Sequence, residues 1–394
     1  MQKPTRTTTE STFLYILFFL SLILIVVLEF TAPNKQVAQQ TLPPPQKATS
    51  EGVVSTLPRT LTETEPSRTS TPVTAPILPR AKKKAAPTAP VAKAVIPPIS
   101  APPPLSTLIP TETVNKATRA ALVNIICTAK NSGVFHPVSG SGVIIDPRGV
   151  ILTNAHLANV LLLKDYPTPN FVECIIRTGS PARNMYRAEL LYISSIWVRQ
   201  NKNNIIEENP TGTGENDFAL LRITESIAES EPLPDTFPFI QYEIDENSIA
   251  EGQSVLIAAY PASFLGGITI QKDLHITSTV SNISKLYTFD QDGLLDLISV
   301  GTNIVAQKGS SGGAVVRQQS GKLTALIVTS SEGESTGARE LNAITLAHIN
   351  RSLKKEMGFD LQNFLATDLV TVAHDFQTII AKGLTETLIA VVEQ

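Results

Sequence analysis

The proline-rich stretch near the N-terminus is the feature that most restricts what this chain can fold into. Seventeen of the 28 prolines lie between residues 31 and 115, among threonine, alanine and serine and without aromatic side chains. Such a segment cannot bury enough apolar surface to offset the entropy that it loses on ordering. We therefore expect residues 31–115 to be a disordered linker, which confines the main folded domain to residues 116–355.

The first thirty residues carry a localisation signal. Residues 13–30 are almost entirely apolar, and Lys3 and Arg6 precede them, as in a signal peptide or a signal anchor. The run is just long enough to span a bilayer, and no good cleavage site follows it. We expect an uncleaved transmembrane signal anchor at residues 13–30, with residues 1–12 in the cytoplasm and the rest outside it, in the periplasm or at the cell surface.

Short apolar runs separated by turn residues fill the region from residue 116 to residue 355. The turn sequence Asp146-Pro-Arg-Gly149 between two such runs indicates a hairpin. Many short strands and few amphipathic helices predict an all-β barrel or sandwich. We expect strands at residues 121–128, 141–145, 150–153, 171–177, 187–193, 218–223, 254–259, 274–280, 295–300, 313–317 and 323–329.

The last residues, 356–394, have a helical pattern instead. Apolar side chains recur at alternating spacings of four and three, at Leu365, Leu369, Val372, Phe376 and Ile379. We expect a helical tail that is interrupted at Gly383. Two interpretations remain open: the tail packs on the β domain, or it forms a surface for homo-oligomerisation.

The chain has two cysteines, Cys127 and Cys174. An extracytoplasmic compartment would permit a disulfide between them, which would close a loop of almost fifty residues. The alternative is a pair of buried thiols in neighbouring strands.

Three residues in a fixed order suggest nucleophilic catalysis. His156 follows a predicted strand in Leu152-Thr-Asn-Ala-His156, Asp217 precedes another, and Ser311 lies in the loop Gly309-Ser-Ser-Gly-Gly313. Hydrolysis by a serine needs a base for its proton, an acid to orient that base and amide donors for the oxyanion. Each feature alone is weak, but the order His, Asp, Ser matches one of the known arrangements of the triad.

Glycines in the serine loop would let successive amide groups point at one spot. We expect the oxyanion hole in the run Gly309, Ser310 and Ser311, chiefly from the amides of the first and third. Because Ser310 is adjacent to Ser311, the sequence leaves open which hydroxyl reacts.

Taken together, residues 117–350 resemble the trypsin-like peptidase domain of the HtrA/Deg type. The resemblance rests on Ser141–His156, on Asn216–Leu221, on Gly252–Pro261, on the serine loop and on Leu341–Thr345. It implies a chymotrypsin-like fold of two perpendicular six-stranded β-barrels. The segment after residue 355 is too short for the PDZ domain that many such proteases carry.

The resemblance also places the primary substrate pocket along Ile327, Val328, Thr329 and Ser330. No acidic residue occurs there or in residues 302–308. We therefore expect a small or medium apolar residue before the scissile bond. Cleavage mainly after lysine or arginine would contradict this expectation.

The sequence favours a serine endopeptidase that acts on extracytoplasmic proteins or peptides. The alternative is a catalytically inactive peptidase-fold module that binds or scaffolds, because Gln307-Lys308 replaces the Asn-Pro that commonly precedes the serine loop. A net charge of −3 argues against nucleic-acid binding. No motif for a metal or another cofactor is present.

Overall fold

The computed structural model describes residues 109–130, 136–207, 212–228, 231–262, 265–291, 293–330 and 340–394. These ranges all belong to one compact unit, Leu105–Gln394. The predicted anchor at residues 13–30, and the linker up to residue 108, lie outside the described residues. Within the described ranges, no helix has the length and apolar character needed to cross a membrane.

The strands of the described chain follow its order. They are β1 (Leu122–Ala129), β2 (Val138–Asp146), β3 (Val150–Thr153), β4 (Val172–Thr178), β5 (Arg183–Ile193), β6 (Ala219–Ser226), β7 (Ser254–Ala259), β8 (Thr277–Asn282), β9 (Lys285–Tyr287), β10 (Leu297–Thr302), β11 (Ala314–Arg317), β12 (Leu323–Ser330) and β13 (Glu340–Thr345).

The helices follow in chain order. They are α2 (Thr111–Ala121), α3 (Ala155–Ala158), α4 (Ser195–Gln200), α5 (Gly267–Lys272), α6 (Leu346–Met357), α7 (Leu361–Leu365), α8 (Leu369–Asp375) and α9 (Lys382–Val392), with the 3₁₀ helices η1 (Asn159–Leu163), η2 (Lys202–Ile205) and η3 (Glu246–Ser248) and the π-helix η5 (Phe376–Ala381).

The first six strands close into a barrel in the order β1-β2-β3-β6-β5-β4. Alternate residues of β1, Val123, Ile125 and Cys127, are buried in one apolar cluster, as expected where successive side chains point to opposite faces of a sheet. Cys127 lies directly opposite Cys174 in the antiparallel β1–β4 pair, and the two form a disulfide. The bridge, rather than the pair of free thiols, is therefore the correct interpretation.

The remaining strands form one seven-stranded sheet in the order β8-β7-β11-β12-β13-β10-β9. This differs from the six-stranded second barrel that we predicted. The end strands β8 and β9 are separated only by Ile283 and Ser284, and the amide of Ser284 donates to the Ser299 carbonyl of β10 at 2.8 Å. The extra strand therefore arises because one segment bends between its contacts with β7 and with β10.

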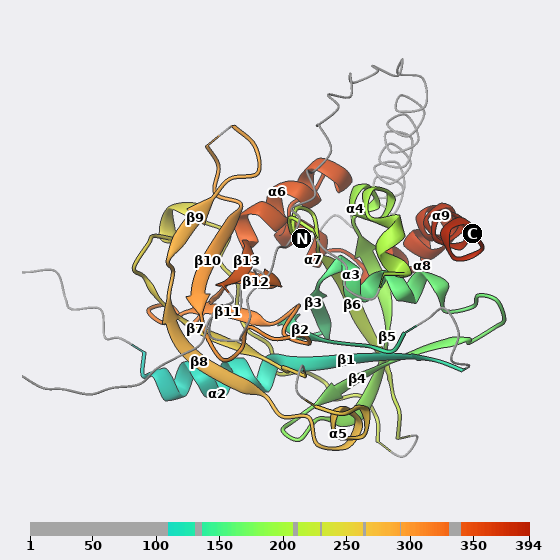
Figure 1. Cartoon of the computed structure of the whole chain (residues 1–394), viewed down its shortest axis with the longest axis horizontal. Coiled ribbons are helices and arrows are strands. Elements are labelled where there is room, and N and C mark those ends of the chain that lie inside the picture. The colour runs from blue at the N-terminus through green and yellow to red at the C-terminus, as the bar shows by residue number, and fades with distance from the viewer. Residues whose placement is uncertain are drawn as a thin grey trace, which may run out of the picture. The chain divides into compact units, whose positions relative to one another are not determined.

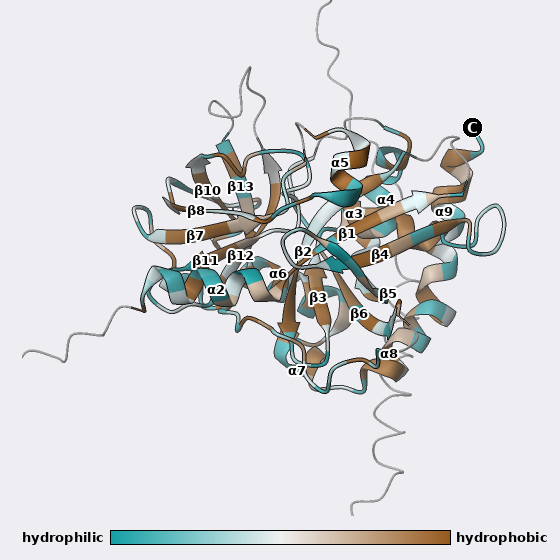
Figure 2. Ribbon diagram, turned by 90° about the horizontal axis from the view of Figure 1, so that it is seen from below, coloured by the Kyte–Doolittle hydropathy of each residue, from teal (hydrophilic) through white to brown (hydrophobic). Residues whose placement is uncertain are grey.

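An apolar cluster joins the barrel to the sheet. Val143 and Leu152 from the barrel share it with Leu256 and Leu326 from the sheet, and all four are fully buried. Figure 1 shows the barrel and the sheet side by side, with α6 between them. Figure 2 shows that hydrophobic residues are concentrated on the strands of both. This contact brings together the segments of the two β units that carry the predicted catalytic residues.

Helix α2 corrects the predicted domain boundary. It begins at Thr111, inside the segment that we assigned to the linker, and the first predicted strand begins one residue later than expected, at Leu122. Val114, Thr118 and Ala121 are buried on one face of α2. Packing of that face stabilises a helix that a proline-rich context would not form alone.

The C-terminal tail packs on the barrel, as one of the two interpretations predicted. Phe376, Leu384 and Leu388 are buried in the same cluster as the barrel interior. The predicted interruption at Gly383 is wrong, because α9 runs through this residue from Lys382 to Val392. A glycine inside a helix costs about 1 kcal/mol relative to alanine. The burial of Leu384 and Leu388 beside it offsets that cost.

Candidate active site

The barrel register places His156 and Asp217 side by side. Strand β3 pairs with β6 so that Thr153 lies opposite Ala219. The chain turns into α3 just after Thr153, and Asp217 lies just before Ala219. Residues 61 positions apart in the sequence therefore meet at one end of the barrel.

The two side chains form a tight pair. His156 Nδ1 lies 2.7 Å from Asp217 Oδ2, and the backbone amide of His156 donates to Oδ1 at 2.9 Å. The aspartate side chain is 7% exposed and the imidazole 22% exposed. Asn154 adds a further constraint, since its amide nitrogen donates to the Asp217 carbonyl at 2.8 Å. A carboxylate held in this way orients the ring and leaves Nε2 for proton transfer.

The structure distinguishes the two adjacent serines. Ser310 is buried, and its hydroxyl donates a short hydrogen bond to the Val305 carbonyl, while its amide donates to the Gln307 carbonyl at 3.1 Å. Ser311 is half-buried, and its hydroxyl makes no hydrogen bond to the described residues. Ser311 therefore has the free hydroxyl. We had included Ser310 in the predicted oxyanion hole, but its amide already donates within the loop.

Ser141 of β2 holds the serine loop against the barrel. Its amide donates to the Ser311 carbonyl at 2.8 Å, and its hydroxyl donates to the Gly309 carbonyl at 2.8 Å. The same oxygen accepts from the Tyr260 amide at 3.0 Å, and the Ser141 carbonyl accepts from the Thr153 hydroxyl at 2.8 Å. One fully buried serine thus connects the serine loop, the end of β7 and the segment that leads to His156.

Gly309 has the geometry expected of an oxyanion hole. Its φ is +90°, and a Cβ added there would lie 2.7 Å from the Tyr260 carbonyl oxygen. The Lys308 carbonyl accepts from the Ala262 amide at 2.7 Å, which fixes the peptide that carries the Gly309 amide. Within the described chain, the amides of Gly309 and Ser311 make no hydrogen bond, so both are available for an oxyanion.

The serine loop also approaches the histidine segment at Gly312. A Cβ at this position would lie 1.9 Å from the Ser141 carbonyl oxygen and 2.8 Å from Thr153 Oγ1. Thr153 is only three residues before His156, so the loop and the imidazole occupy the same region. No hydrogen bond joins Ser311 to His156 among the described residues. Catalytic hydrogen bonds are often long in the absence of substrate.

Two of the four residues predicted to line the substrate pocket lie in the core. Ile327 and Val328 are buried at 1% and 3% exposure, and each packs in an apolar core cluster rather than facing a pocket. The reason is that both faces of β12 are covered: Ile327 packs in one apolar cluster and Val328, which points to the opposite face, packs in another. Thr329 and Ser330 pair with β13, and their side chains lie outside the described residues.

Sequence reasoning missed several residues of this site, namely Ser141, Asn154, Tyr260 and Ala262. A signal was present for Ser141, because a serine between two glycines inside an apolar strand has to satisfy its hydroxyl within the protein. Nothing in the sequence indicated that its partners lie more than a hundred residues away. Nor did it indicate that the amide of Ala262 donates to the Lys308 carbonyl.

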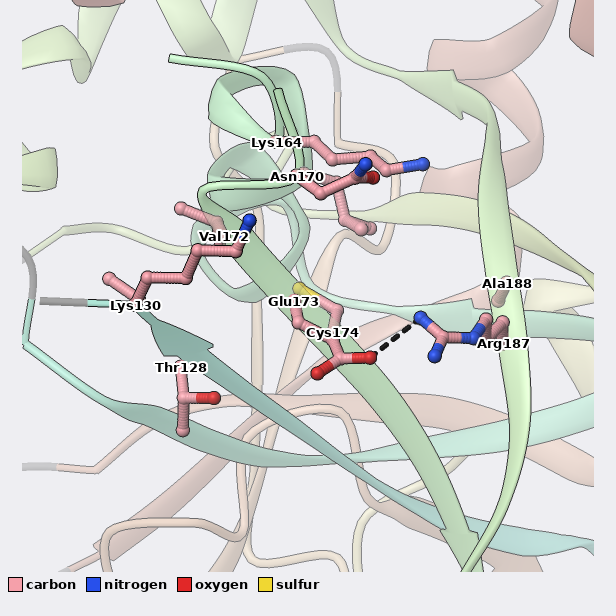
Figure 3. Close-up of a pocket in the computed structure, with 11 residues that line it drawn as sticks. Thr128, Lys130, Lys164, Asn170, Val172, Glu173, Cys174, Arg187 and Ala188 are labelled. Carbon is pink, nitrogen blue, oxygen red and sulfur yellow. Dashed lines mark ion pairs between the residues drawn. The ribbon is translucent and has the colours of Figure 1, made fainter. Parts of the chain in front are cut away.

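A cavity elsewhere on the barrel contains no triad residue. Lys130, Lys164 and Arg187 line it together with Cys174 of the disulfide, and Arg187 pairs with Glu173 at 2.6 Å (Figure 3). Within the described ranges, no group of three histidine, cysteine or acidic side chains has a geometry that could hold a metal ion. The His156–Asp217 pair and the serine loop are therefore the candidate active site.

Part of the chain is similar to known proteins. Residues 140–326 match the family model of the trypsin-like peptidase domain. Deg5 is similar at 15% identity and a TM-score of 0.40, over 61% of this chain and 90% of that chain. The Rv3671c protease from M. tuberculosis in its active form is similar at 16% identity and a TM-score of 0.39, over 68% of this chain and 95% of that chain. No curated protein matches the sequence significantly. Residues 140–326 are therefore similar to a trypsin-like peptidase domain.

Proposed function

We propose that this protein is a serine endopeptidase of the HtrA/Deg type that hydrolyses peptide bonds with His156, Asp217 and Ser311. The observation that carries the proposal is the His156–Asp217 pair, with an Nδ1 to Oδ2 distance of 2.7 Å, next to a loop in which only Ser311 has a free hydroxyl. The peptidase-domain match covers all three residues.

The geometry supports the following reaction. His156 Nε2 takes the proton of Ser311 as its Oγ attacks the substrate carbonyl, and the amides of Gly309 and Ser311 donate to the oxyanion. Asp217 stabilises the imidazolium that forms. His156 then gives its proton to the leaving amine, and water releases the acyl group by the same route in reverse.

The test is labelling with a fluorophosphonate probe followed by mass spectrometry of the modified peptide. The wild type should be labelled at Ser311, and Ser311→Ala should lose both labelling and peptide hydrolysis. Ser310→Ala is the matched control. The Ser310 hydroxyl is bonded inside the loop, so this variant should still be labelled at Ser311. Hydrolysis that continues in Ser311→Ala would refute the assignment.

A second candidate is a peptide-binding module without turnover. The observation in its favour is the missing hydrogen bond between Ser311 and His156, together with Gln307 and Lys308 before the loop. It predicts that a peptide binds the wild type and Ser311→Ala equally and that neither is labelled. The same experiment therefore decides between the two candidates.

We also propose that residues 13–30 anchor the protein in a membrane, with the peptidase domain outside the cytoplasm. The support is the charge-free run of Phe13–Leu28 after two basic residues. In spheroplasts or intact cells, externally added protease should digest the domain. Protection of the domain until the membrane is lysed would contradict this topology.

A further inference from the structure

A second histidine–aspartate pair lies in the interior of the domain. His348, on α6, faces Asp296 with 2.8 Å between Nδ1 and Oδ1, and its Nε2 lies 3.3 Å from Ser352 Oγ. Asp296, His348 and Ser352 are only 5%, 7% and 8% exposed. The three side chains have the connectivity of a catalytic triad, but no substrate can reach them. They must serve another purpose.

The chain of hydrogen bonds ends beside the active site. The Ser352 hydroxyl donates to Asn216 Oδ1 at 2.8 Å, and Asn216 immediately precedes Asp217. A serine hydroxyl has a single proton, and the shorter distance commits it to Asn216 rather than to His348. Ser352 of helix α6 thus holds Asn216, the residue next to the Asp217 carboxylate.

Asn216 needs such a contact because of its backbone conformation. Its φ is +55°, in the left-handed region that side chains other than glycine adopt only at a cost of order 1 kcal/mol. In this turn the Asp217 amide donates to Gly214, and the Phe218 amide donates to the Asn216 carbonyl at 2.9 Å. The turn sets the direction in which Asp217 leaves the backbone. Relaxation of Asn216 would therefore move the carboxylate away from His156.

Groups on α6 itself and on neighbouring segments surround His348. Arg351 donates to Asp296 Oδ1 and to Glu246, both at 2.7 Å, and the Phe289 ring packs edge-on against the imidazole. Burial lowers the pKa of His348, while Asp296 and Glu215 oppose the shift and Arg351 adds to it. Its orientation thus depends on the Asp296 contact, which leaves Nε2 toward Ser352.

We propose that Ser352 is a positioning residue for the peptidase: it fixes Asn216 and thereby aims Asp217 at His156. This inference rests on the proposed function. It assigns a catalytic purpose to helix α6, which is remote from the reacting atoms.

The experiment compares Ser352→Ala in two backgrounds. Glycine takes a φ of +55° without steric cost, so Asn216→Gly should not need the Ser352 contact. We expect Ser352→Ala to lower kcat by roughly tenfold with KM changed less than about twofold, since small displacements of catalytic groups act on the chemical step. In the Asn216→Gly background, the same substitution should have no further effect.

Thr118→Val is the matched control. Thr118 is a buried helical hydroxyl residue like Ser352, but it lies in α2, and its hydroxyl donates to the Val114 carbonyl at 2.8 Å. The substitution Thr118→Val should leave kcat unchanged. An equal loss of kcat in Ser352→Ala with and without Asn216→Gly would show that the hydroxyl only stabilises the fold, and would overturn the proposal.

A second measurement does not depend on turnover. Proton NMR of histidine-labelled protein should show the far-downfield signal of the His156 N–H bound to Asp217, assigned by its loss in His156→Ala. The signal should weaken or shift in Ser352→Ala and return when Asn216→Gly is added. An unchanged signal in Ser352→Ala would contradict the positioning role, even if the wild type proved unreactive and the proposed function failed.

Discussion

At the scale of single residues, the site depends on where each small side chain directs its one proton. Ser310 uses its hydroxyl inside the loop, whereas Ser311 keeps its own free. Ser141 accepts from the Tyr260 amide, so its proton goes to the Gly309 carbonyl. The orientation of the Gly309 peptide therefore depends on a buried serine of β2.

Replacing Ser141 with alanine tests this dependence. The change leaves the Gly309 carbonyl and the Tyr260 amide without their partner in a buried place, which costs about 1–3 kcal/mol for an unsatisfied group. We expect a lower unfolding free energy and, because the amide of Gly309 loses its fixed direction, a kcat reduced by roughly tenfold or more. Urea unfolding and steady-state kinetics on one peptide substrate measure the two effects.

Thr324→Val serves as the control for this prediction. Thr324 is fully buried on β12, and its hydroxyl has no hydrogen-bond partner in the described chain. Removing that hydroxyl should leave stability unchanged or raise it slightly, with kcat intact. If Ser141→Ala behaved like Thr324→Val, the hydroxyl of Ser141 would have no part in shaping the loop.

At the scale of elements, helix α6 connects the two β units. Its first half faces the sheet side of the domain, where His348 and Arg351 bind Asp296. Its second half faces the barrel, where Ser352 binds Asn216 and the Glu356 carboxylate accepts from the Ser194 hydroxyl at 2.6 Å. The helix is thus more than a cap after the last strand.

The Glu356 contact makes a prediction about pH. Burial raises the pKa of Glu356 above 4.5, and hydrogen bonds from Ser194 and the Ser195 amide only partly oppose the shift. The folded state therefore binds more protons than the unfolded state, so this group's contribution to stability is full below pH 4.5 and is lost as the pH rises through the folded-state pKa. In Glu356→Gln this loss should be absent. Unfolding free energies of both proteins, measured from acid to neutral pH, should diverge in favour of the variant; parallel curves would contradict the prediction.

At the scale of the whole molecule, the site is assembled from both β units. His156 and Asp217 come from the closed barrel, and Ser311 comes from the loop before β11 of the sheet. Neither unit contains a complete triad. The proposed triad is therefore completed only across the apolar contact between the two units.

The disulfide adds a constraint to the barrel that holds His156. Cys127 and Cys174 enclose 47 positions of sequence, which include β2, β3 and α3. A loop of that length restricts the unfolded chain by about 4 kcal/mol in the chain-entropy account. The double variant Cys127→Ala and Cys174→Ala should lose stability of this order, measured by denaturant unfolding against the oxidised wild type. A loss below about 1 kcal/mol would show that the barrel does not depend on its bridge.

The sequence by itself determined the local properties of this protein. Alternating and continuous apolar runs predicted nearly all the strands, and the order of His156, Asp217 and Ser311 predicted the reaction class. These signals are readable because strand periodicity and turn chemistry involve residues that are close in sequence.

Only the tertiary structure decided which groups are partners. The β3–β6 register brought Asp217 to His156, and the contact between the β units brought Ser141 to Gly309, 168 residues away. The same contacts showed that Ser310 is already bonded and that Ser352 reaches Asn216. Pairings of this kind depend on how strands align and close, and a linear pattern does not encode the partner of a buried hydroxyl.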